Sequence, residues 1–250
     1  MQIKLRKLNC REISDYKNSN RSTPFWLVQF VFNFQTEKFD RSILKKIEEE
    51  GQRLANVVNE KAANDSQNKR PHERKLSNAI AGVLAEYCWK TFLNTVSLDI
   101  ITKETPFNRA DDQIDLETLT TKKTIEVRSS FPRNGIDFAI CHHDHEFDIL
   151  GPYTNNYKPN EIQKDFYLRT LYHTQSPTDF LKEFKKDGFV TTLTGGATWD
   201  MMADDDIAIV KALIPEDDIS DFEVKSNYRV IPFSRALDCA EIYKAIKENQ

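Results

Sequence analysis

Two ionisable residues stand two positions apart in a stretch with the character of a buried strand, KKTIEVRSS at 122–130. Side chains alternate along a strand, so Glu126 and Arg128 share one face while Ile125 and Val127 point the other way. Because an isolated charge is costly to bury, two charges on one strand face either pair with each other or take part in chemistry.

A third ionisable residue, Asp115, precedes this strand in QIDLET. The five residues LTTKK join the two stretches and predict a hairpin, which would place the carboxylate of Asp115 beside that of Glu126. Paired carboxylates are typical ligands of Mg²⁺, which keeps several waters and binds substrate phosphates. Arg128 on the same face is then placed to bind the scissile phosphate.

These residues resemble the core motif of the PD-(D/E)XK nucleases, the restriction-endonuclease-like superfamily, which has an acid on one strand and acid–x–lysine on the next. Asp115 matches the first acid, Glu126 the second, and Arg128 stands where the lysine is expected. Many members carry a glutamate on the preceding helix. LSNAIAGVLAEYCWKTFL resembles that helix and places Glu86 in this role, at the edge of the apolar stripe.

A further element, QKDFY at 163–167, is similar to the Gln-x-x-x-Tyr element that some of these nucleases have on a helix after the core. It assigns Gln163 and Tyr167 to substrate binding. Arginine does not lose its proton, so it can bind phosphate but cannot act as a general base. Lys164 is the first candidate to replace the missing lysine, followed by Lys122 and Lys123.

The resemblance implies an α/β fold of the restriction-endonuclease-like type: a mixed central β-sheet flanked by helices, with N- and C-terminal additions. The chain is expected to be a single domain, 1–250, with a nuclease-like core over 73–172. The implied activity is an Mg²⁺- or Mn²⁺-dependent endonuclease acting on DNA, with RNA left open, in restriction, defence or repair. A homodimer is a natural assembly, because cutting both strands of a duplex usually recruits two active sites.

Two alternatives remain open. The protein is a noncatalytic nucleic-acid-binding or assembly protein that kept the fold and lost the lysine, or a zinc hydrolase. The zinc alternative rests on CHHDHEFD, where a strand would place Cys141, His143 and His145 on one face beside His142. No second cluster supplies a fourth ligand, so a polar strand end near the cleft is preferred.

The elements that must position these residues follow from apolar patterning. Strands are expected at 1–10, 25–34, 113–119, 122–130, 136–142, 189–198 and 228–234, with a strand or loop at 98–104. Helices are expected at 40–64, at about 73–93, at 161–173 and at 236–250, with a short helix starting near 198. Residues 151–160, GPYTNNYKPN, are expected to form a long loop. This mixed order favours an α/β or α+β domain with one central sheet.

Composition sets the broad class. The chain has 250 residues, of which 39% are apolar and 30% are charged, which is typical of a globular protein. A net charge of −4 argues against nonspecific coating of nucleic acid but allows a local basic groove. Four cysteines without a CxxC pair predict neither a disulfide framework nor a zinc framework, and favour the reducing cytoplasm. The longest apolar run, FWLVQFVFNF, is too short to cross a bilayer, so no membrane association is expected.

Overall fold

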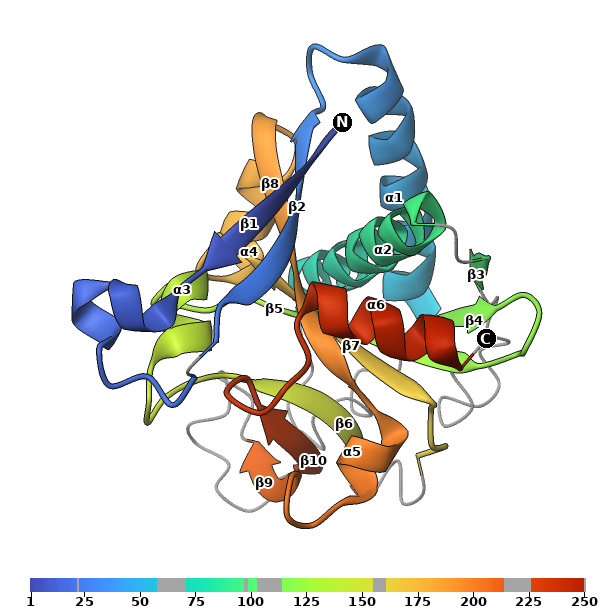
Figure 1. The fold of residues 1–250 in the computed structure, drawn as a ribbon. Coiled ribbons are helices and arrows are strands. Elements are labelled where there is room, and N and C mark those ends of the chain that lie inside the picture. Colours follow the sequence, from blue (N-terminus) through green and yellow to red (C-terminus); the bar gives the residue numbers. More distant parts are fainter. Residues whose placement is uncertain are drawn as a thin grey trace.

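The structure is a computed structural model that describes residues 1–21, 23–57, 71–96, 99–102, 114–154, 161–213 and 226–249. Its centre is a seven-stranded sheet with the strand order β1-β2-β8-β7-β5-β4-β3 (Figure 1). The strands are β1 (Gln2–Leu8), β2 (Phe25–Asn33), β8 (Asp187–Thr198), β7 (Phe166–Tyr172), β5 (Thr124–Ser130), β4 (Leu116–Thr118) and β3 (Ile100–Thr102). All neighbouring pairs are antiparallel except β5 and β7, which run parallel, so the sheet is mixed.

One face of this sheet is covered by helices. Their apolar side chains pack with those of the strands in a single core cluster. The helices on this face are α1 (Lys38–Val57), α2 (His72–Thr95), α4 (Pro177–Glu183) and α6 (Cys239–Glu248). Helix α2 lies at the middle of the layer, where Ile80, Leu84, Cys88 and Trp89 are buried at helical spacing.

The opposite face is covered by a second, three-stranded sheet and two short helices, which form a separate core cluster (Figure 1). The small sheet has the order β6-β10-β9, and all its pairs are antiparallel. These elements are β6 (Asp148–Thr154), β10 (Ser226–Pro232), β9 (Ile209–Leu213), α3 (Ile136–Cys141) and α5 (Trp199–Ala203). The chain is thus α/β, a mixed central sheet flanked by helices, as the sequence predicts.

Strand β2 shows why the sheet is buried on both faces. Its alternating positions Phe30 and Phe32 face the helical layer, where their rings stack, while Phe25 and Leu27 face the small sheet. Apolar residues at every second position on both faces give the continuous apolar run seen in the sequence, as expected for a central strand.

Three local expectations of secondary structure are wrong. Residues 166–172, expected within a helix, form strand β7, and residues 136–141, expected as a strand, form helix α3. Residues 151–154 of the expected loop belong to β6, and 155–160 lie outside the described residues. The expected helix at 40–64 is described only as far as Val57.

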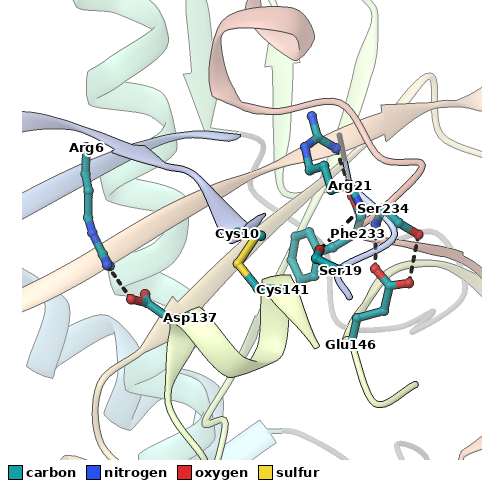
Figure 2. The surroundings of a disulfide bond; sticks show 9 residues. All are labelled: Arg6, Cys10, Ser19, Arg21, Asp137, Cys141, Glu146, Phe233 and Ser234. Atoms are coloured by element: carbon teal, nitrogen blue, oxygen red, sulfur yellow. Dashed lines mark hydrogen bonds and ion pairs between the residues drawn. A yellow bond between two sulfur atoms is a disulfide. The ribbon is translucent and has the colours of Figure 1, made fainter. Parts of the chain in front are cut away.

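The fourth correction is a disulfide, which joins Cys10 to Cys141 across 131 residues (Figure 2). It fixes the 3-10 helix η1 (Cys10–Glu12) to α3. An ion pair between Arg6 and Asp137 joins the same two regions. A second 3-10 helix, η2 (Ser14–Tyr16), follows in this N-terminal segment. In the part of the chain that the structure describes, no helix combines the length and the apolarity needed to cross a membrane.

Candidate active site

The predicted hairpin is present and sets the geometry of the site. Strands β4 and β5 pair antiparallel, with Leu116 opposite Ile125. One step further along both strands, Asp115 lies across from Glu126, and the backbone N–H of Val127 donates to Oδ2 of Asp115 over 2.7 Å. The structure therefore brings the two carboxylates of the motif together at the start of β5.

The strand also divides its side chains as predicted. Ile125 and Val127 belong to the core cluster under α2, so Glu126 and Arg128 point toward the small sheet. Only 12% of the Glu126 side chain and 17% of the Arg128 side chain are exposed. These two ionisable groups are therefore held on the buried inner face between the two sheets.

The acids form an electrostatically coupled cluster with Glu86 on α2. Burial raises the pKa of Glu86 well above its ordinary value, and the charges of Asp115 and Glu126 raise it further. The pKa of Glu126 is raised to about 7, chiefly by burial. The charge of Arg128 acts in the opposite direction, and the charge of Asp115 acts in the same direction as burial. Two carboxyl groups of raised pKa beside the carboxylate of Asp115 form a site that favours a bound cation.

Arg128 is the best-connected residue of the site. Its Nη2 lies 2.9 Å from Oε1 of Glu126 and 3.0 Å from Oε1 of Glu161. The backbone N–H of Tyr153 donates to Oε2 of Glu161 over 2.9 Å, which fixes this second acid. The rings of Tyr153 and Tyr228 lie 5.1 and 5.8 Å from the guanidinium carbon. Arg128 is therefore held between two carboxylates through its Nη2.

Sequence reasoning missed Glu161. Its side chain is only 5% exposed, in the segment that was expected to be a helix. The sequence carries no local signal for it, because Glu161 is 33 residues from Arg128 and meets it only in the folded chain.

Lys164 is the lysine that reaches the cluster. It is 1% exposed, and among the described residues its Nζ has no hydrogen-bond partner. Its positive charge lowers the pKa of Glu126, so the ammonium group interacts electrostatically with the acid cluster. The other candidates are engaged elsewhere: Nζ of Lys122 lies 3.5 Å from Glu117, and Nζ of Lys123 lies 2.9 Å from Asp165.

Tyr167 joins the cluster from the neighbouring strand, whereas Gln163 does not. Tyr167 stands opposite Glu126 in the parallel register of β5 and β7, and its hydroxyl accepts the backbone N–H of Lys164 over 3.0 Å. Burial raises the pKa of Tyr167, and the charge of Glu126 raises it further. Gln163 is exposed in the loop before β7.

The chemistry of the acids fits a hard divalent cation, since Asp115, Glu126 and Glu86 offer only oxygen ligands. As the side chains lie, however, no three His, Cys, Asp or Glu residues in the described ranges are grouped to hold an ion. Arg128 engages Oε1 of Glu126, one of the oxygens that an ion would use.

The histidine cluster has a different structure from the one that a zinc site requires. Cys141 ends α3 and is bound in the disulfide, so it cannot supply a thiolate. His142 lies just after the helix, where its Nδ1 accepts the backbone N–H groups of Asp144 and His145 at 3.2 and 3.1 Å. The strand that was to place Cys141, His143 and His145 on one face is absent, so the zinc alternative is withdrawn.

Comparison with known proteins gives no function directly. No protein-family model matches the chain, and no solved structure matches it. A similar protein is the "Uncharacterized protein MJECS01" of Methanocaldococcus jannaschii, which is 29% identical over 180 residues. The alignment covers 68% of this chain and 63% of the archaeal protein, so the chain spans less than two thirds of the length of this relative.

Proposed function

We propose that the chain is a metal-dependent nuclease that hydrolyses phosphodiester bonds in DNA. The observation that carries the proposal is the convergence of four groups at the start of β5. The hairpin brings Asp115 beside Glu126, α2 supplies Glu86, and the loop before β7 supplies the buried ammonium of Lys164. These groups come from three separate parts of the chain, as in an assembled active site.

In this proposal Asp115 and Glu126 hold Mg²⁺ or Mn²⁺, and Glu86 assists the ion or its water. The ion, when bound, supplies a water of lowered pKa and charge stabilisation on the phosphate. Lys164 takes the place of the motif lysine, because an amine can bind phosphate and can also exchange a proton. Arg128 keeps the role that the sequence predicts for it, binding the scissile phosphate, and its bonds to Glu161 hold it beside the acids.

The fold supports the proposal at the level of architecture. The resemblance implies a mixed central sheet flanked by helices, and the chain has that arrangement with α2, β3, β4 and β5 in the expected order. A core over 73–172, with β1, β2 and the C-terminal elements as additions, and a role in restriction or defence remain part of the proposal.

A noncatalytic nucleic-acid-binding protein is the second candidate. The ion pair between Arg128 and Glu126 favours this candidate. It engages the carboxylate of the motif and can act as a structural element. In such a protein the acid cluster serves stability rather than hydrolysis.

The two candidates are separated by incubating purified protein with supercoiled plasmid and linear DNA in the presence of Mg²⁺, Mn²⁺ or EDTA. A nuclease nicks or linearises the plasmid only with a metal ion, and Glu126→Gln abolishes the reaction. Glu49→Gln is the matched control, because Glu49 is 65% exposed on α1 and remote in role from the cluster. Metal-dependent cleavage that survives in Glu126→Gln would refute the assignment of this site.

A further inference from the structure

A pocket of about 340 Å³ lies at the far end of β5 from the acid cluster. Its wall combines polar groups from the first turns of α2 and the end of β5 with apolar groups from three other positions. The lining residues are Arg74, Asn78, Ser129, Ser130, Phe131, Phe147 and Pro177. No acid is among these described lining residues, which offer hydrogen-bond donors and an apolar surface.

A buried cation stands behind this wall. Arg169 on β7 is only 3% exposed and lies opposite Arg128 in the parallel register, so no carboxylate faces it there. Its Nη2 donates to the Oγ of Ser130 over 2.8 Å, while its Nε and Nη1 have no hydrogen-bond partner among the described residues. Burial, together with the charge of Arg128, lowers the pKa of Arg169 to about 10. Asp148, which Lys211 already neutralises, offsets this charge only in part.

Ser130 connects this charge to the pocket. A hydroxyl has one proton to donate and two lone pairs, and one lone pair of Ser130 accepts the bond from Arg169. The hydroxyl proton is thereby free to turn toward an acceptor in the pocket, strengthened by the adjacent cation. Arg74 and Asn78, four residues apart on one face of α2, add a guanidinium and an amide to the same wall.

We propose that this pocket binds one nucleotide of the DNA strand, with its phosphate against Ser130, Arg74 and Asn78 and its sugar or base against Phe131 and Phe147. The proposal rests on the proposed function for the identity of the strand. Glu126 and Ser130 are four residues apart on one strand face, or about 13 Å. The pocket therefore lies within the length of a few nucleotides of the acid cluster.

The test measures binding of a short fluorescein-labelled DNA strand by anisotropy in EDTA, where no cleavage occurs. Asn78→Asp adds a negative charge to the wall without touching the buried arginine, and we expect it to weaken binding by about tenfold or more. Arg74→Glu serves the same purpose if Asn78→Asp does not fold. Asn56→Asp, the same substitution at an exposed position on α1, should bind like the wild type.

Competition identifies what the pocket holds. Thymidine 5′-monophosphate should displace the labelled strand at lower concentration than inorganic phosphate, because only the nucleotide contacts the apolar wall. Equal competition by inorganic phosphate would overturn the nucleotide assignment. Wild-type protein that does not bind DNA, or folded pocket variants that bind it unchanged, would overturn the proposal entirely. Pocket-dependent binding without cleavage in Mg²⁺ supports the pocket and refutes only the nuclease.

Discussion

Replacing Glu126 by glutamine should change both the stability of the protein and its response to metal ions. The pKa of this carboxyl is raised from 4.5 to about 7, chiefly by burial. At about 1.4 kcal/mol for each pH unit, ionising Glu126 in the folded chain costs about 3 kcal/mol. Because the folded chain keeps the proton to a higher pH than the unfolded chain, the free energy of unfolding falls as the pH rises from about 4.5 to about 7.

Glutamine is neutral throughout, so the variant lacks this fall. We compare the free energies of unfolding of Glu126→Gln and the wild type. Between pH 4 and pH 8 we expect the difference between them to shift in favour of the variant by up to about 3 kcal/mol. Arg128 remains paired with Glu161 in the variant, which limits the loss of its other contact. The measurement is urea unfolding of both proteins at pH 4 and pH 8, with Glu49→Gln as the control that keeps the wild-type dependence.

Magnesium should stabilise the wild type but not Glu126→Gln at pH 8. An ion at ten times its dissociation constant stabilises the wild type by about 1.4 kcal/mol, which raises the melting temperature by about 3–6 °C. Glu126→Gln should show little change, because it has lost a ligand. A variant with the same pH dependence as the wild type would refute the assignment of the raised pKa to Glu126. Equal stabilisation of both proteins by Mg²⁺ would place the ion elsewhere.

Three further predictions concern the groups around the acids. Lys164→Met should abolish plasmid cleavage without lowering the melting temperature, since it removes a buried cation without a hydrogen-bond partner, whereas Lys122→Met should cleave normally. Arg128→Ala should lower the free energy of unfolding by about 3–5 kcal/mol in urea titrations, because it removes the cation that lies between two buried carboxylates, and unchanged stability would contradict the ion-pair geometry. Reduction of the Cys10–Cys141 disulfide, which spans 131 residues, should lower stability by about 2–5 kcal/mol, and a melting temperature insensitive to reductant would show that the bond is absent in solution.

The parts of the fold that the sequence predicts are those whose pattern is local. Helix α2 follows from apolar residues at helical spacing, and α6 from its capping box, in which Asp238 caps the helix and Glu241 returns to the Asp238 backbone. The hairpin of β4 and β5 follows from two short apolar stretches and a polar turn. Its register then carries Asp115 to Glu126 without any knowledge of the rest of the chain.

The errors lie where tertiary structure overrides that pattern. All seven residues of β7 are buried, because both faces of the central sheet are covered, so the strand shows no alternation of apolar and polar residues. Its apolar side chains instead fall at spacings that resemble a helix. The disulfide was missed for a related reason, since spacing in sequence says nothing about two cysteines that meet only in the folded chain.

The departure from the nuclease motif has a physical explanation within the proposal. In the motif a single residue, the lysine two positions after the second acid, both balances the negative charge of the acids and takes part in the chemistry. In this chain Arg128 balances Glu126 and Glu161, a task suited to a guanidinium that bonds two carboxylates at once. Lys164 brings a second cation to the same acids from the start of β7. Dividing the two tasks gives charge balance to the permanently charged Arg128 and places the group that can exchange a proton beside the carboxylates.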